Sequence, residues 1–101
     1  MTITKIINEK SAEIHLKEKL IFLDDRGFRN SLNECLVADI DSLNIYMDEL
    51  YFMDSAGLGM LIIARNECKK INIPLTLYNP SGDVKTLLQM TKSYDKFNIV
   101  D

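Results

Sequence analysis

The sequence contains little of what several functional classes require. It has two cysteines and a single histidine, His15. A structural zinc site needs about four ligands, so zinc binding is not expected. Lysine and arginine number 12 against 15 aspartates and glutamates, which gives a net charge of −3. Nucleic acids attract basic surfaces, so this balance argues against direct nucleic-acid binding.

Long apolar runs are also missing. No segment approaches the roughly 18 apolar residues of a membrane-spanning helix, and residues 1–10 lack the apolar stretch of a signal peptide. We therefore expect a cytoplasmic protein that does not contact a membrane. In a reducing compartment Cys35 and Cys68, which lie far apart in helix-like segments, are interpreted as small buried apolar groups.

The 101 residues, of which 47% are hydrophobic and 27% charged, predict a single globular domain over residues 1–101. Apolar periodicity divides this domain into alternating strands and helices. Strands are expected at residues 3–8, 12–16 (extending as far as 22), 43–50, 73–78 and 97–100, and helices at about 25–38, 58–71 and 83–91. This order predicts an α/β fold with a four- to five-stranded, mostly parallel sheet, an antiparallel N-terminal edge hairpin and helices packed against the sheet.

Short polar side chains mark where two of the helices begin. Asp24 and Asp25 are good helix starters because a side-chain oxygen can accept a free backbone N–H. Ser81 or Asp83 serves the third helix in the same way.

The most informative segment is FMDSAGLGML at residues 52–61, which follows the predicted central strand and opens a helix. In parallel sheets, ligands and partners are met beyond the carboxyl ends of the strands. The unpaired N–H groups and partial positive charge of a helix N-terminus stabilise a phosphate. Ser55 could therefore carry a phosphate without unfolding the helix. Simple helix capping by residues 54 and 55 is the alternative interpretation.

The same segment resembles the hallmark of the STAS domain family of anti-sigma-factor antagonists, in which Asp-Ser-(Ser, Thr or Ala)-Gly-Leu-Gly follows the third strand. Residues 22–29 resemble the lead into the first helix of that family. Residues 75–84, with an Asn-x-Ser-x-x-Val pattern, resemble its fourth strand and the start of its third helix. The order of elements agrees from about residue 2 to residue 100. The resemblance implies a STAS-like fold in a short, single-domain bacterial member.

The resemblance further implies signal transduction by partner switching, with an effect on transcription. Ser55 matches the serine that a cognate kinase, often itself the anti-sigma factor, phosphorylates and that a metal-dependent serine phosphatase restores. Asp54 would orient the Ser55 hydroxyl, and Ala56 leaves Ser55 as the motif's only acceptor. The protein would need no catalytic residue and no cofactor. Partner contacts, with this kinase or with another regulatory protein, are expected at Asp54, Ala56, Gly57, Leu58, Gly59, Met60, Asp24 and Asp25.

One stretch departs from the family pattern. Residues 18–21, Glu-Lys-Leu-Ile, stand where many members have Gly-(Glu or Arg)-(Leu or Phe)-Asp. The aspartate that lies near the serine in relatives is therefore missing, and Asp24 or Asp25 is the candidate to replace it. The chain also stops after the last predicted strand, as do short members that regulate surface attachment, biofilm or motility.

Two other interpretations stay open. STAS domains also occur in lipid-transporting ABC complexes and in anion transporters, often without an intact phosphoacceptor, so residues 54–57 favour the switch. As an enzyme, the chain would be a small phosphotransfer or nucleotide-binding domain, with Asp54 accepting a phosphoryl group and the pair at 24–25 binding magnesium. Ile62 stands where the dinucleotide fingerprint needs glycine, and no Gly-Lys-Ser/Thr loop exists, so an enzyme is not expected.

Overall fold

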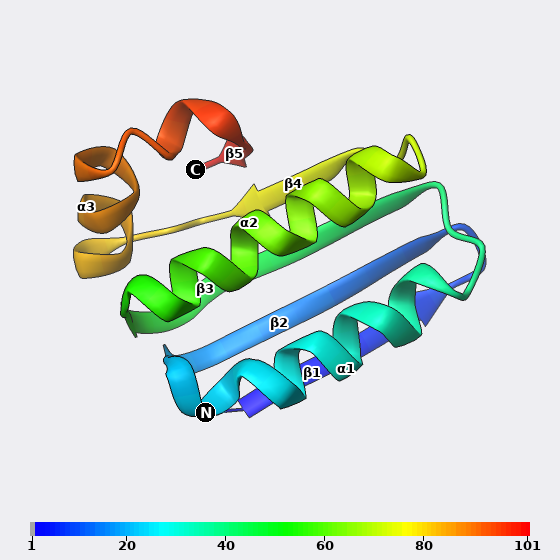
Figure 1. The fold of residues 1–101 in the computed structure, drawn as a ribbon, viewed down its shortest axis with the longest axis horizontal. Helices are drawn as coiled ribbons and strands as arrows, with labels where there is room; N and C mark the ends of the chain where they lie inside the picture. The colour runs from blue at the N-terminus through cyan, green and yellow to red at the C-terminus, as the bar shows by residue number, and fades with distance from the viewer. Residues whose placement is uncertain (1) are drawn as a thin grey trace.

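Five strands form one sheet, and they lie side by side in the order in which they occur in the chain. The computed structural model describes residues 2–101 (Figure 1). The strands are β1 (Thr2–Asn8), β2 (Ser11–Leu20), β3 (Ser42–Met53), β4 (Leu75–Tyr78) and β5 (Asn98–Val100). β1 and β2 form an antiparallel hairpin, and all other neighbours are parallel. The predicted sheet, with its antiparallel N-terminal edge and a central third strand, is confirmed.

Three helices connect the parallel strands. They are α1 (Asp25–Leu36), α2 (Ser55–Lys70) and α3 (Gly82–Met90), with the 3-10 turns η1 (Phe22–Asp24) before α1 and η2 (Tyr94–Lys96) before β5. Each connection advances one strand in the same direction, so right-handed crossovers put the helices on one face of the sheet. Figure 1 shows α1 and α2 side by side in front of the sheet. None of the helices within residues 2–101 is long and apolar enough to cross a membrane.

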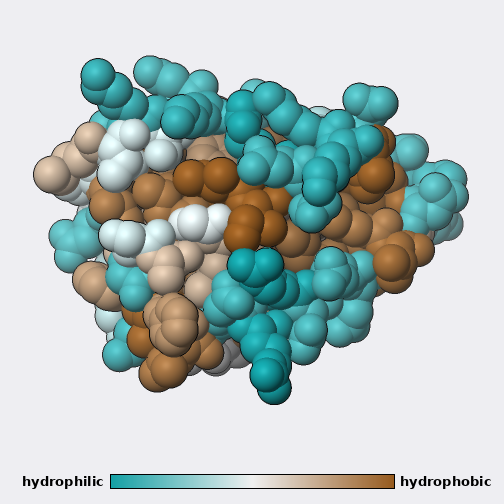
Figure 2. All heavy atoms as spheres, in the orientation of Figure 1, coloured by the Kyte–Doolittle hydropathy of each residue, from teal (hydrophilic) through white to brown (hydrophobic). Residues whose placement is uncertain are grey.

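The core lies between these helices and the covered face of the sheet. Alternate strand residues point inward, as the period of a strand requires; Ile14, Ile45 and Leu77 are neighbours across three strands and are fully buried. Figure 2 shows a band of apolar residues across the middle of the helix-covered face, bordered by hydrophilic residues. Cys35 and Cys68 are free and buried in this core, as interpreted from the sequence. Burial raises the pKa of the Cys68 thiol to about 11.

Several boundaries differ from those predicted. β3 continues to Met53 instead of ending at residue 50. The alternation of buried residues breaks after Met47, so the sequence pattern did not reveal the end of the strand. α2 begins at Ser55, three residues before the predicted start. The expectation that Ser81 caps α3 through its side chain is wrong: Ser81 is the N-cap residue, but its side chain makes no capping hydrogen bond.

Candidate functional site

Ser55 lies where the central strand passes into a helix. β3 ends at Met53, Asp54 forms the N-cap of α2 in an extended conformation, and Ser55 is the first helical residue. The Ser55 residue is exposed. Its hydroxyl therefore stands at the positive end of a 16-residue helix, where added negative charge is stabilised.

Asp54 fixes this junction through both carboxylate oxygens. Oδ1 accepts the N–H of Gly57 at 2.8 Å, which caps α2, and Oδ2 accepts the N–H of Phe22 at 3.2 Å, which reaches into η1. The backbone N–H of Asp54 donates to the carbonyl of Leu20 at the end of β2, over 3.3 Å. Asp54 thus joins the end of β2, the start of η1 and the first turn of α2 around Ser55.

Gly57 allows the first turn of α2 to approach β2 closely. A Cβ at this position would lie 2.6 Å from Met53 Cγ and still closer to the Leu20 carbonyl oxygen. Real Cβ atoms do not make such contacts, so only glycine fits without a shift of the backbone. Gly59 differs, because a Cβ there would meet no atom within 4 Å.

The two aspartates proposed to replace the missing family aspartate have different partners. Asp24 Oδ2 accepts the N–H of Ile21 at 2.9 Å, and Ile21 occupies the position at which the family aspartate is missing. Asp25 instead binds Arg29, one turn along α1, at 2.9 Å. Asp24 is therefore hydrogen-bonded to the residue at the vacated position, whereas Asp25 is paired along α1. The expectation that Asp24 caps α1 through its side chain is wrong, because that carboxylate bonds within η1 instead.

The predicted partner-contacting residues fall into two groups. Asp54, Ala56 and Gly59 are half-buried, so part of each is open to a partner, and half-buried Asp24 and Asp25 lie on the adjoining turn. The remaining three residues are buried: Gly57 is buried as a residue, Leu58 is 8% exposed and Met60 is 1% exposed. The side chain of Met60 belongs to the buried core in this structure, and its contact with a partner stays a prediction.

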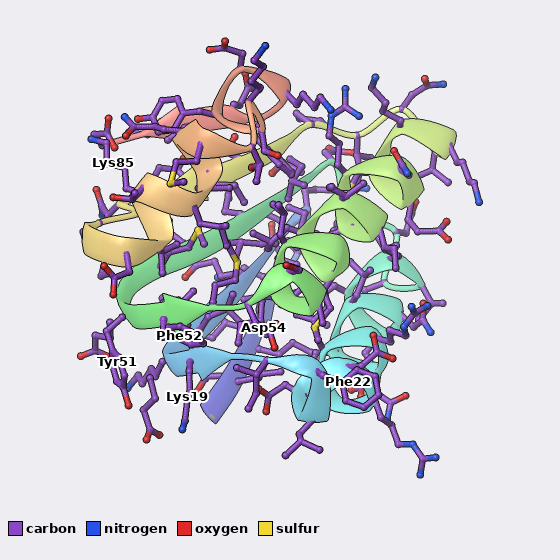
Figure 3. All side chains as sticks on the ribbon, turned by 60° about the vertical axis from the view of Figure 1, so that its left-hand side comes forward. Lys19, Phe22, Tyr51, Phe52, Asp54 and Lys85 are labelled. Atoms are coloured by element: carbon purple, nitrogen blue, oxygen red, sulfur yellow. The ribbon has the colours of Figure 1, made fainter. Side chains whose placement is uncertain are left out.

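Exposed apolar side chains lie on the two segments that Asp54 joins, the end of β3 and η1, and they were not identified from the sequence as a surface. Phe22 is 71% exposed, Leu23 83%, Tyr51 61% and Phe52 42%; we call these four residues the apolar rim. Figure 3 shows Tyr51, Phe52, Asp54 and Phe22 along the same end of the molecule. Large apolar groups gathered on a surface mark protein interaction sites. Lys19, which pairs in register with Phe52, supplies a cation to this end.

No metal centre accompanies these groups in the described chain. Within residues 2–101, no three His, Cys, Asp or Glu side chains gather closely enough to hold a metal ion. Both oxygens of Asp54 already accept backbone N–H groups, and Asp25 is paired with Arg29. The site therefore offers a hydroxyl, a helix N-terminus and an apolar surface.

The chain was compared with protein families and with solved structures, and both comparisons found matches. The family model of the STAS domain matches residues 3–101. Similar solved structures include the anti-sigma factor antagonist SpoIIAA in its unphosphorylated form, at TM-score 0.77 and 18% identity, covering 99% of this chain and 88% of that one. The Bacillus cell fate determinant SpoIIAA in the phosphorylated form is similar at a TM-score of 0.76 and 17% identity. The match covers 99% of this chain and 92% of that one. A sulfate transporter family protein from Wolinella succinogenes is similar at a TM-score of 0.80 and 14% identity. The match covers 96% of this chain and 81% of that one. Comparison with curated proteins gives no match.

Proposed function

The chain belongs to the STAS domain family, and on that premise we propose that it is an anti-sigma-factor-antagonist-like partner switch controlled by reversible phosphorylation of Ser55. The single observation that carries this proposal is the exposed Ser55 at the start of α2, directly after the strand whose end carries part of the apolar rim. The switch works in the cytoplasm and has no catalytic residue of its own. A serine kinase that doubles as an anti-sigma factor adds the phosphate, and a metal-dependent serine phosphatase removes it.

The unphosphorylated form binds its partner through the apolar rim and the exposed start of α2. Apolar side chains at 42–83% exposure lose unfavourable contact with water when a partner covers them. A phosphate on Ser55 adds about −1.5 to −2 charges at the centre of this contact. Desolvating that charge against an apolar partner surface is costly, so phosphorylation weakens binding.

The fold likeness supports this proposal without carrying it. One similar structure is named an anti-sigma factor antagonist in its unphosphorylated form, and another is named as a phosphorylated form of the same protein. In this chain Ser55 is exposed, and the Asp54 carboxylate caps the helix that Ser55 opens, which supports the proposal.

The deciding experiment combines the purified chain with ATP and the serine kinase encoded beside its gene, and maps the phosphate by mass spectrometry. We expect modification at Ser55, none in Ser55→Ala, and unchanged modification in Ser81→Ala, a matched control at another exposed helix start. In a binding assay with the same kinase, Ser55→Asp should bind about tenfold or more weakly than Ser55→Ala. Equal affinity of these two variants would exclude the switch.

A second candidate function is a regulatory subunit or domain of a transporter, favoured by the fold likeness to the sulfate transporter family protein. In that case a membrane protein would be the partner, and Ser55 would not need to be modified. Co-purification of the tagged chain from membrane and soluble fractions separates the two functions. Recovery with a transporter, together with a wild-type phenotype for Ser55→Ala in cells, would favour this candidate.

A further inference from the structure

A hollow lies toward the end of α2 that is opposite Ser55. It has a volume of about 330 Å³ and is lined by the C-terminal half of α2, the lead into β4, and the segment from η2 into β5. This volume is at the lower end of the range for pockets that bind small molecules. With a rise of 1.5 Å per residue, Arg65 lies about 15 Å along the helix from Ser55. The hollow is therefore separate from the proposed switch.

The lining of this hollow is strongly basic. Arg65, Lys69 and Lys96 line it together with one carboxylate, Asp95, which gives a local charge of three minus one, or +2, in a chain of net charge −3. Among the ion pairs formed within residues 2–101, none includes these three cations. Figure 2 shows hydrophilic residues gathered along the upper edge of the helix-covered face, beside α2.

One of these cations is held in place by the fold. Arg65 Nε donates to the carbonyl oxygen of Lys96 over 2.7 Å, which joins α2 to the end of η2. This bond orients the guanidinium and leaves its two terminal amino groups for an anion. A planar guanidinium with free terminal amino groups is well suited to phosphate oxygens.

The wall beside these cations is apolar. Ile73 and Phe97 are half-buried, and Leu75 is 8% exposed. A bare inorganic anion would leave this wall in contact with water, and an uncharged apolar molecule would leave the cations without a partner. A ligand that satisfies both parts carries a dianion on a small apolar body.

We propose that this hollow binds a small, soluble organic phosphate monoester. The phosphate, which carries nearly two negative charges at neutral pH, meets Arg65, Lys69 and Lys96. The organic group packs against Phe97 and Ile73. This site does not depend on the phosphorylation of Ser55.

The proposal is tested by titrating the ¹⁵N-labelled full chain with phenyl phosphate and following amide shifts by NMR. We expect saturable shifts in the amides of Cys68, Ile73 and Phe97. Lys69→Gln should raise the dissociation constant about tenfold, as the loss of one charge-assisted contact predicts. Lys92→Gln, an exposed lysine that follows α3 outside the hollow, is the control and should leave the constant unchanged. Arg65→Gln should act like Lys69→Gln, but it also removes the bond to Lys96, so Lys69→Gln is the primary variant.

Comparison ligands and variants define the outcomes that overturn the proposal. Inorganic phosphate, which lacks the ring, and benzoate, which has the ring but a single charge, should each bind several-fold more weakly than phenyl phosphate. Equal affinity for inorganic phosphate, no saturable shift at millimolar ligand, or unchanged affinity in Lys69→Gln would each overturn it. Binding only to vesicles that contain phosphatidic acid would also overturn it. Ser55→Ala should bind phenyl phosphate like the wild type, so failure here is distinguishable from failure of the switch.

Discussion

At the residue scale, Gly57 stands where the first turn of α2 meets the end of β2. A methyl group at this position would overlap the Leu20 carbonyl oxygen and Met53 Cγ. Gly57→Ala is therefore expected to lower the free energy of unfolding by about 1–3 kcal/mol, the usual cost of overpacking. Urea unfolding followed by circular dichroism measures this change.

Gly59 provides the matched control two residues along the same helix. Its Cβ position is open, and alanine is a better helix former than glycine by about 1 kcal/mol. Gly59→Ala should therefore raise the free energy of unfolding by up to about 1 kcal/mol. A loss of stability in both variants, or in neither, would contradict the close approach assigned to Gly57.

Glu18 occupies the position at which many family members have glycine, and its backbone shows why glycine suits that position. Its φ of 68° lies in the left-handed region, and it sits between two shifts in the register of β2 against β3. Side chains other than glycine are disfavoured there by about 1 kcal/mol. Glu18→Gly should raise the midpoint of urea unfolding, whereas Lys19→Gly, at the next position of the same strand, should lower it. An unchanged or lowered midpoint in Glu18→Gly would contradict the strain.

The buried thiol of Cys68 makes stability depend on alkaline pH. Burial raises its pKa from 9.0 to about 11, so between these values the folded state retains a proton that the unfolded state has lost. The contribution is complete below pH 9 and disappears as the pH rises to 11, which lowers the free energy of unfolding by about 2 kcal/mol. Urea unfolding at about pH 8, below both pKa values, and at about pH 10.5, between them, measures the drop. Cys68→Ala should show a smaller drop than the wild type, and an equal drop would contradict this assignment.

At the scale of elements, Asp54 connects α2 to η1 through one carboxylate. Asp54→Ala removes the cap on Gly57 and the acceptor for Phe22, so it should cost about 1–2 kcal/mol of unfolding free energy. Asp54→Asn keeps an acceptor oxygen and should cost clearly less, since Asn is a good N-cap residue. Thermal unfolding of both variants measures the difference. An equal loss in the two variants would indicate that the charge, and not the cap, is what matters.

The elements themselves could largely be predicted from the sequence, because strands and helices bury residues with different periods. The order of strands and helices follows from apolar spacing, and the buried cysteines from their place in helix-like segments of a reducing compartment. The end of β3 could not be found in this way: Leu50 and Met53 are both buried with two exposed residues between them, which breaks the alternation. A local irregularity of this kind depends on the neighbouring strand, and β2 shifts its register beside it.

The register between neighbouring strands also could not be predicted from the sequence. The rings of His15, Tyr46 and Tyr78 stack in a row across β2, β3 and β4, with centroids 4.6 Å apart in each pair. The three rings stack only when the strands are paired in the correct register. The periodicity of a single strand does not determine that register. The same holds for the site. The Ser55 motif was recognisable in the sequence. The apolar rim was not, because it combines residues of η1 with residues at the end of β3, which only the folded structure brings to the same end of the molecule.

At the scale of the whole molecule, the proposed activities occupy opposite ends of α2. Ser55 and the apolar rim lie at its N-terminal end, and the basic hollow lies beside its C-terminal half. Both ends rest on one rigid helix packed across the core, through buried residues such as Leu61 and Ala64. A protein partner could therefore cover one end while a small anion occupies the other, and the two would not compete for the same surface.

This arrangement predicts how the proposed phosphorylation of Ser55 would act on the molecule as a whole. Ser55 is exposed and is the first residue of α2, so a negative charge there meets the partial positive charge of the helix and no buried group. Ser55→Asp should leave the free energy of unfolding unchanged or raise it by up to about 1 kcal/mol, and Ser55→Lys should lower it by a similar amount. Urea unfolding of the isolated chain measures both. A loss of more than about 2 kcal/mol in Ser55→Asp would mean that the charge loosens the fold. The expected result means instead that the phosphate alters only the surface presented to a partner, so binding can change while the fold persists.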